Sequence, residues 1–440
     1  MAAPPQQSRS PVCVGLASAG VLLAVIGLVA LACGQPVIGR LAAVLGTSAF
    51  AISLWFSRRF AGYQFTIWIV AVVMAAMLYP SQFLHPAGLD MRNKWVMLIA
   101  IQLVMFGMGT QMRLHDFAGV VKSPRGVFVG IFCHFSVMPL VGWGLTKLFD
   151  FPPEIAAGVI LIGSCSSGLA SNVMAYMARS NLALSVTVTA VTTVIAPFMT
   201  PLWMKLLAGT LVHVSFFHMM MDIVKIMLVP IGAALLHDYL RHARAGARHF
   251  LVVLALLAAA WLLALPLGLW AWLQTGFSEN GLTVIALGGF LLSAVVIGVV
   301  YHTVVKRLPA LDRAMPAVAI VGILYVTAMT TASGRDNLLK VGGLLFLASG
   351  LHNTAGYVAG YFLSRLAGLD KNSARSVAFE VGLQNGGMAS GLASGMGKLG
   401  TVGLAAAIFI PWMNISGSLL ANYWAKRPTG EASQRGVQPT

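Results

Sequence analysis

The stretch SVAFEVGLQNGGMASGLASG (residues 376–395) places one carboxylate, Glu380, inside an otherwise uncharged segment long enough to cross a bilayer. An ionisable side chain near the middle of a membrane is costly unless its surroundings compensate it, so such residues usually mark the path of an ion or substrate. Gln384, Asn385 and several glycines follow Glu380, and the stretch contains no basic residue to pair with it. An acid with amide neighbours and helix-breaking glycines indicates a site for a small cation.

The composition indicates a membrane protein. Of the 440 residues, 58% are hydrophobic and 9% are charged, and the mean hydropathy is +0.85. Long continuous runs of about 20 apolar residues are typical of membrane-spanning helices. We therefore predict an all-α polytopic membrane protein that forms one unit of fourteen transmembrane helices. The predicted spans are 12–34, 37–57, 64–83, 94–112, 126–148, 154–178, 182–208, 218–238, 249–274, 281–303, 315–333, 341–364, 373–397 and 402–424.

The distribution of charge predicts the topology. The chain carries 28 Lys and Arg against 12 Asp and Glu, a net charge of +16. Most of the basic residues fall in alternate loops between the spans, as the positive-inside rule predicts when both termini are cytoplasmic. This pattern argues against a nucleic-acid partner. We expect a multi-pass protein of the cell (inner) membrane, with the lipid bilayer as its surroundings.

Two other sequence features carry less weight. The segment ALACG (30–34) resembles a lipoprotein cleavage site, but the apolar run before it is long and starts with only Arg9, so we expect a retained helix. The four cysteines all fall in apolar stretches without paired spacing. Neither a disulfide nor a zinc site is therefore expected.

Two of the predicted spans are interrupted at their centres. SCSSGLASN (164–172) places Ser, Gly and Asn in the sixth span, and residues 382–387 place Gly, Gln and Asn in the thirteenth. Such a pair in corresponding positions of two halves points to the central site of a transporter, because unwound backbone frees carbonyls for cations and half-helix N-termini attract anions. Close helix packing through small residues is the alternative, and Glu380 beside one break disfavours it.

The seventh predicted span, LALSVTVTAVTTVIAPFMTPL (182–202), adds hydroxyl groups. Ser185 and Thr189 are four residues apart and share one face of a helix. Hydroxyl, amide, backbone and carboxylate oxygens together form a set that suits Na⁺ and does not suit soft metals.

Three segments, SNVMAYMARSNLALSVTVT (171–189), MTPL (199–202) and FEVGLQN (379–385), resemble in this order the motifs of the bile acid:sodium symporter family. The likeness covers about 64–240 and 310–424. It implies ten helices in two inverted five-helix repeats, divided into a panel domain and a core domain that contains two broken, crossing helices.

The resemblance also implies the site residues. A first sodium site would comprise Ser171, Asn172, Ser185, Thr189 and Glu380. A second would use Glu380, the backbone of Val381 and Leu383, Gln384, and His134 in place of the family's glutamine. Substrate contacts would fall at Leu169, Ala170, Asn385 and Asn414.

The chain departs from the family pattern by four additional helices and by its first break. The predicted parts are two extra N-terminal helices (1–63), the first repeat with the first helix of the second (64–240), two inserted helices (241–309), the remainder of the second repeat (310–425) and a cytoplasmic tail (426–440). Each insertion holds an even number of helices, so the inverted topology is preserved. Ser166, Ser167 and Gly168 replace a common Pro-Gly-Gly, and Leu169 replaces a polar substrate contact, so the substrate chemistry can differ.

These expectations converge on a sodium-coupled secondary active transporter, a symporter of a small organic anion that works by alternating access. Na⁺ is the expected coupling ion, and no organic cofactor is expected. A proton-coupled or exporting carrier on the same fold is an alternative, and a membrane receptor or sensor is an alternative from another class. An intramembrane enzyme would need a zinc cluster, a catalytic Asp pair or a Ser/His set within the spans, and the sequence shows none. Substrate identity and oligomeric state stay open.

Overall fold

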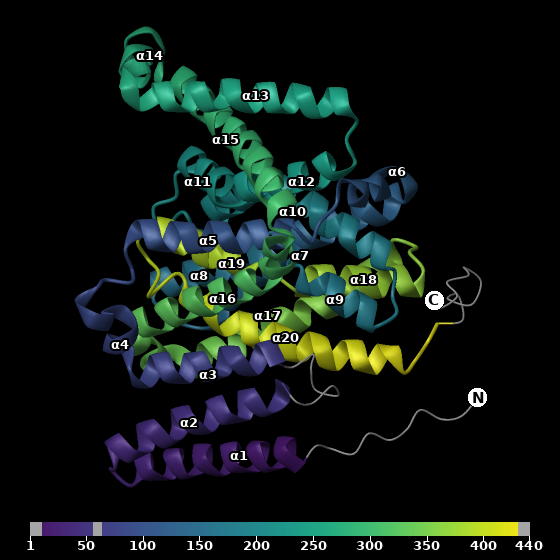
Figure 1. The fold of residues 1–440 in the computed structure, drawn as a ribbon. Helices are drawn as coiled ribbons and strands as arrows, with labels where there is room; N and C mark the ends of the chain where they lie inside the picture. Colours follow the sequence, from purple (N-terminus) through teal and green to yellow (C-terminus); the bar gives the residue numbers. More distant parts are fainter. Residues whose placement is uncertain (1–10, 56–63, 430–440) are drawn as a thin grey trace.

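The computed structural model describes residues 11–55 and 64–429, and the regular secondary structure of these residues is helical (Figure 1). In the first half the helices are α1 (Pro11–Ala32), α2 (Pro36–Trp55), α3 (Gln64–Leu78), α4 (Pro80–Leu84), η2 (Pro86–Gly88), α5 (Lys94–Gly109), η3 (Leu114–Ala118), α6 (Gly119–Lys122), α7 (Pro124–Leu148), α8 (Pro153–Ser164), α9 (Ala170–Met177) and α10 (Leu182–Ala208). In the second half they are α11 (Phe216–Ile223), the π-helical turn η4 (Val224–Leu228), α12 (Val229–His242), α13 (Ala245–Ala264), a second π-helical turn η5 (Leu265–Leu269), α14 (Trp270–Gly276), α15 (Glu279–Arg307), α16 (Pro309–Ser333), α17 (Arg335–Leu366), α18 (Lys371–Gly382), α19 (Gly386–Gly395) and α20 (Leu404–Ala425).

The helices support a multi-pass membrane protein, but helix length and composition alone do not identify every predicted span. By length and composition eight helices of the described chain can cross a membrane, or ten if each of two bent pairs counts as one span. The remaining predicted spans correspond to α1, α17 and the two interrupted pairs α8–α9 and α18–α19. The pairs are cut into halves of 12 and 8 residues and of 12 and 10 residues, each too short to cross alone. The count of fourteen thus stays a prediction.

The helices pack in two groups. The first, which we name the panel group, comprises α3, α5, α12 and α16, with α5 packed against α12 and α16. The second, the core group, comprises α7–α10 and α17–α20, with α7 packed against α8, α10, α17 and α18. The two largest fully buried side chains of the described residues, Phe379 and Phe409, both belong to the core group. The groups meet where α19 contacts α5 and α16, and where α20 contacts α3 and α16.

The two breaks of the core group lie against each other. The chain leaves the helical conformation after Ser164 and again after Gly382. An isolated antiparallel bridge joins Ser167 of the first break to Gln384 of the second, so the two unwound segments cross at their centres. The helical halves α9 and α19 both begin at this crossing.

Gly168 allows the two backbones to approach this closely. Its amide nitrogen donates to the Leu383 carbonyl oxygen over 3.0 Å. A Cβ atom at residue 168 would lie 2.7 Å from the carbonyl oxygen of Gln384, closer than real side chains come. The sequence therefore needs glycine here because of the facing backbone, since no left-handed conformation is involved.

Helix α18 begins at a capping residue outside the membrane-spanning part. Asp370 accepts hydrogen bonds from the Ser373 amide over 3.0 Å and from the Ser373 hydroxyl over 2.6 Å. Burial alone would raise the pKa of Asp370, but these hydrogen bonds together outweigh it and hold the pKa below its usual value. The cap fixes where the helix that carries Glu380 starts.

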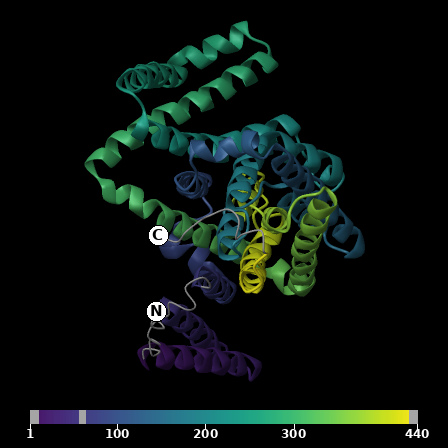
Figure 2. The ribbon, with the colours of Figure 1, turned by 90° about the vertical axis from the view of Figure 1, so that its right-hand side faces the viewer.

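The additional helices form two lobes at opposite ends of the molecule (Figures 1 and 2). At one end α1 and α2 pack as a hairpin, and α2 contacts α3. At the other end α13, α14 and α15 project from the panel group, where α15 packs on α12 and α16. Only 11% of the most apolar window of 245–276 and 17% of that of 281–307 is buried, against 61% for 216–242. The apolar faces of this projecting lobe are therefore positioned to contact lipid.

The predicted domain boundaries stay predictions. Residues 1–10 and 56–63 of the predicted N-terminal part lie outside the described residues, as do residues 430–440 of the predicted tail. The predicted cytoplasmic location of both termini therefore concerns segments outside the described residues.

Candidate functional site

Five oxygen-bearing side chains converge beside the crossing of the broken helices. Glu380 lies in the last turn of α18, Ser171 and Asn172 lie in the first turn of α9, and Ser185 and Thr189 lie one turn apart on α10. All five are the residues that the sequence predicted for the first sodium site. Apart from Asn172, which is partly exposed, each is at most 2% exposed.

The oxygens of these side chains are in direct contact. The Ser185 hydroxyl donates to Glu380 Oε1, and the Thr189 hydroxyl lies 2.8 Å from Glu380 Oε2. The same two hydroxyl oxygens lie 2.9 and 3.2 Å from Asn172 Oδ1. The Ser171 hydroxyl lies 3.2 Å from that of Thr189. We name this set of five residues the oxygen cluster.

The oxygen cluster holds more acceptors than protons. Ionised Glu380 and the Asn172 amide present three oxygens that can only accept. The hydroxyls of Ser185 and Thr189 each face two of these oxygens, yet each has one proton to donate. The Ser171 hydroxyl donates to the backbone carbonyl three residues before it, over 2.8 Å. A cation bound between these oxygens would satisfy the remaining lone pairs.

The charge of the cluster suits a monovalent cation. Glu380 is fully buried, and no Lys, Arg or His side chain in the described part of the chain forms an ion pair with its carboxylate. A buried charge without a partner is strongly unfavourable. Within the described residues, no group of three or more His, Cys, Asp or Glu side chains forms a candidate metal site. One carboxylate surrounded by neutral oxygens balances a single positive charge.

The residues predicted for the second sodium site surround the second break. The Glu380 carbonyl oxygen lies 2.9 Å from His134 Nδ1, and the Val381 carbonyl accepts from Gln384 Nε2 over 2.8 Å. The Leu383 carbonyl is occupied by the amide of the facing break. Gln384 Oε1 is buried and has no hydrogen-bond partner among the described residues. This acceptor is the one ligand of the predicted set that is left free.

His134 bridges the two breaks through both of its ring nitrogens. Nδ1 lies 2.9 Å from the Glu380 carbonyl oxygen, and Nε2 lies 2.8 Å from the Cys165 carbonyl oxygen. The ring is fully buried. A neutral imidazole has only one N–H group, so both carbonyls are satisfied together only by the protonated ring. The neutral ring donates to one of the two carbonyls at a time, and it stands at the position where the resemblance implies an amide.

The residues predicted to contact substrate lie around the same crossing. Leu169 and Ala170 start the α9 half-helix, and Asn385 caps α19 by accepting from the Met388 amide over 3.0 Å. Asn414 of α20 donates to the carbonyl four residues before it over 2.8 Å. The amides of both asparagines are thus partly used by their own helices. Their role towards a substrate stays a prediction.

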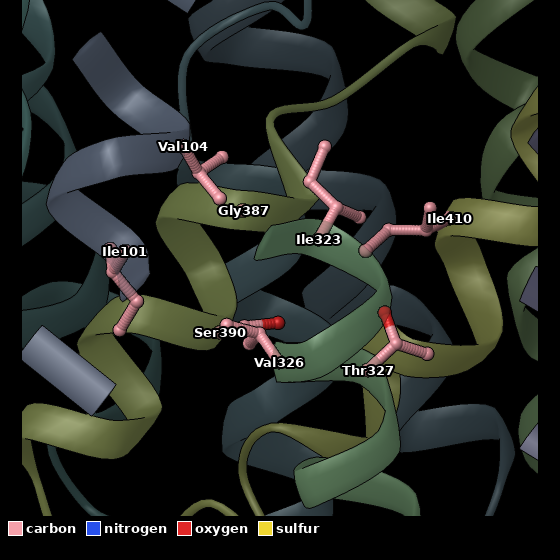
Figure 3. A pocket seen from close by; sticks show the side chains of 8 residues that line it. All are labelled: Ile101, Val104, Ile323, Val326, Thr327, Gly387, Ser390 and Ile410. Atoms are coloured by element: carbon pink, nitrogen blue, oxygen red, sulfur yellow. The ribbon is translucent and has the colours of Figure 1, made fainter. Parts of the chain in front are cut away.

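A small cavity separates the core group from the panel group near this crossing (Figure 3). Its volume is about 10 Å³, the size of about one water molecule. The lining residues are Ile101 and Val104 of α5, Ile323, Val326 and Thr327 of α16, Gly387 and Ser390 of α19, and Ile410 of α20. Gly387 lies two residues after Asn385, and the Ile410 carbonyl accepts from Asn414. No lining residue is itself a predicted substrate contact. The two groups are packed together in this conformation.

Two polar residues near the breaks, Ser167 and Asn353, were not among the predicted site residues. The Ser167 hydroxyl lies 3.4 Å from that of Ser171 and donates to the Leu383 carbonyl over 3.3 Å. Asn353 of α17 donates from Nδ2 to the Gly382 carbonyl over 2.8 Å and accepts from a serine hydroxyl of α20. Asn353 could have been noticed as a lone amide in an apolar span, since such residues usually bond to a neighbouring helix.

Comparisons with known proteins identify the family of the chain. A sequence profile of the Sodium Bile acid symporter family matches residues 98–276. The chain is 31% identical over 373 residues to YocS of Bacillus subtilis, an uncharacterized sodium-dependent transporter, covering 84% of this chain and 92% of that protein. It is 27% identical over 367 residues to BASS1, a probable chloroplastic sodium/metabolite cotransporter of Arabidopsis thaliana, covering 82% of this chain and 73% of that protein.

A human relative and a solved structure are more distant. The chain is 27% identical over 291 residues to the human ileal sodium/bile acid cotransporter, and the aligned residues cover 66% of each chain. The structure of the sodium proton antiporter MjNhaP1 from Methanocaldococcus jannaschii at pH 8 aligns over 94% of this chain and 98% of that chain, but its TM-score of 0.42 and 12% identity are too low to support a conclusion. On the sequence relationships, the chain belongs to the sodium bile acid symporter family of membrane transporters, and it is not an enzyme.

Proposed function

We propose that this chain is a symporter that couples the inward flow of Na⁺ to the uptake of a small organic anion. The observation that carries the proposal is the oxygen cluster, in which a fully buried carboxylate without an ionic partner meets more acceptor oxygens than hydroxyl protons. Hard oxygen ligands with one negative charge suit Na⁺. The relatives are described as sodium-dependent or sodium/metabolite transporters, which supports Na⁺ as the coupling ion.

The anion is proposed from the half-helices at the crossing. The N-termini of α9 and α19 both face this region, and each carries the partial positive charge of a helix dipole. A carboxylate is the simplest group that such ends attract. Relatives whose names include bile acid and metabolite support organic anions as the class. The sequence difference at Leu169, where a polar contact is common, favours a substrate less polar at that point.

Alternating access is proposed from the packing between the two groups of helices. The cavity beside the crossing holds about one water molecule, so an organic anion needs the core group to move away from the panel group. The side chains at this contact are mostly aliphatic, and Gly387 and Ser390 are the small residues that face them (Figure 3). Such a contact carries few specific interactions that must be broken. A sliding or rocking motion of one group is therefore the expected transport step.

Removal of the Glu380 charge tests the proposal. Glu380→Gln keeps the shape of the side chain and removes the negative charge at the oxygen cluster. We expect Na⁺-driven uptake to be lost while the protein is still inserted in the membrane. Uptake that keeps the wild-type rate and sodium dependence in this variant would refute the assignment.

The ion itself is tested by separating sodium from protons. In proteoliposomes held at zero membrane potential, an inward Na⁺ gradient with the same pH on both sides should drive uptake. A pH gradient with the same Na⁺ concentration on both sides should not. The opposite result would support the proton-coupled alternative. A thermal-unfolding screen of organic anions, with and without Na⁺, would then identify the substrate class, because a ligand that binds the folded state raises its stability.

A further inference from the structure

A basic pocket lies on the panel group, outside the oxygen cluster. It is formed where α5 ends at Gly109 and where α12 ends at His242, and its volume is about 490 Å³. We name it the arginine pocket, and its lining residues are Thr110, Arg113, His115, Asp238, Arg241 and His242. Neither the sequence motifs nor the proposed transport site involves these residues.

The charges around the arginine pocket leave one arginine without an ionic partner. Arg113 forms no ion pair with any carboxylate in the described residues, and Asp116 beside it accepts from the Arg113 backbone amide instead. Arg241 lies 3.3 Å from Asp312 of α16. Asp238 is the single carboxylate in the lining. With neutral histidines the lining therefore carries a net positive charge.

Basic residues of the inserted lobe add to the field of this pocket. Arg248 of α13 donates to the Leu240 carbonyl over 3.1 Å and to the Arg241 carbonyl over 3.2 Å, at the C-terminus of α12. Lys306 lies near the end of α15. These contacts hold the start of the lobe against the end of α12, so the pocket stands at the junction of the lobe and the panel group.

The position of the pocket matches the depth of lipid headgroups. It opens where two apolar helices end, beside a lobe whose apolar faces are largely exposed. The positive-inside pattern assigns these loops to the cytoplasmic side, where the leaflet is anionic. Basic pockets between membrane helices on that side bind phosphate-bearing headgroups, and guanidinium groups match phosphate oxygens in pairs.

We propose that the arginine pocket binds a phosphate-bearing anion, supplied by an anionic lipid headgroup or by soluble phosphate, through Arg113 and Arg241. Binding would hold the end of α5 to the end of α12. Through the Arg241–Asp312 ion pair it would also reach α16, where Asp312 accepts from Tyr301 of α15 over 3.1 Å. An occupied pocket should thus stabilise the panel group and the inserted lobe together.

The test follows the thermal unfolding midpoint of the full-length protein in detergent micelles. One arm titrates dioleoylphosphatidylglycerol against dioleoylphosphatidylcholine, and the other titrates inorganic phosphate against chloride at equal ionic strength. We expect phosphatidylglycerol to raise the midpoint of the wild-type protein. In Arg113→Gln the concentration for half of the shift should rise about fivefold, since one basic side chain near an anionic surface contributes about 1 kcal/mol.

Two further variants keep the result interpretable. Arg307→Gln makes the same change of charge at an exposed residue on the same side but outside the pocket, and it should respond like the wild type. Asp238→Asn removes the carboxylate of the lining and should lower the concentration needed. An Arg113-dependent shift with phosphate alone would support a soluble ligand, and one with the lipid alone would support a headgroup. Equal responses of Arg113→Gln and Arg307→Gln, or no preference for either phosphate source over its control, would overturn the proposal.

Discussion

The Thr189 hydroxyl offers the sharpest test of the oxygen cluster. It lies 2.8 Å from Glu380 Oε2 and 3.2 Å from both Asn172 Oδ1 and the Ser171 hydroxyl, so Thr189→Val removes one oxygen that contacts three others. Valine nearly matches threonine in shape, and Thr189 is only 2% exposed. The substitution therefore changes the chemistry of the cluster more than its packing.

The size of the effect follows from the charge on Glu380. A hydrogen bond to a charged group contributes about 1.5–3 kcal/mol, and the lost oxygen also ceases to face a bound cation. Each 1.4 kcal/mol is tenfold in affinity, so the sodium concentration for half-maximal uptake should rise about 10- to 100-fold. The maximal rate at saturating sodium should change much less, because the substrate contacts are untouched.

A matched control lies on the same helix. Thr192 is also buried, but its hydroxyl donates to the Thr189 carbonyl over 3.0 Å within α10 and does not contact the oxygen cluster. Uptake into proteoliposomes, measured over a range of sodium at constant ionic strength, should show the shift in Thr189→Val and not in Thr192→Val. Equal shifts in the two variants, or a change in substrate affinity alone at every sodium level, would refute the placement of sodium in the cluster.

Three other variants test the surrounding structure. His134→Gln places an amide oxygen where the imidazole ring now contacts two backbone carbonyls. The Hill coefficient for sodium should therefore rise from about one towards two, and an unchanged coefficient would make His134 a packing residue. Gly168→Ala puts a Cβ atom 2.7 Å from the Gln384 carbonyl oxygen and should lower stability in detergent by about 1–3 kcal/mol, whereas Gly343→Ala, with open space around it, should not. Asp370→Ala should cost about 1 kcal/mol at neutral pH. Because the pKa of Asp370 is lowered in the folded state, this difference should persist above the usual aspartate range and vanish as the pH falls through the lowered pKa.

Local sequence was sufficient to locate much of the site, because the chemistry there is unusual for a membrane. Glu380 stood out as a lone carboxylate, and the breaks stood out because Gly and polar residues replace aliphatic residues in two spans. The resemblance to a family then brought Ser185 and Thr189 to the same place, and the structure puts their hydroxyls against that carboxylate.

Other features depend on contacts between distant segments, which the sequence does not display. That His134 bonds a carbonyl from each break follows from the way α7 packs against α8 and α18. Gln384 Oε1 is left without a partner because the amide nitrogen of the same side chain donates to the Val381 carbonyl. The number of spans stays a prediction for the same reason, since a broken helix crosses a membrane only together with its partner half.

The shortage of protons in the oxygen cluster bears on how tightly the two fluxes are linked. Without a cation, the Glu380 carboxylate and the Asn172 oxygen compete for the same two hydroxyl protons, and the buried charge of Glu380 is uncompensated. A carrier loaded with the organic anion alone would enter the closed state with that charge and a second negative charge beside it. Passage of the substrate without sodium, which would let accumulated substrate leak out, is suppressed by the same lone pairs that hold the ion.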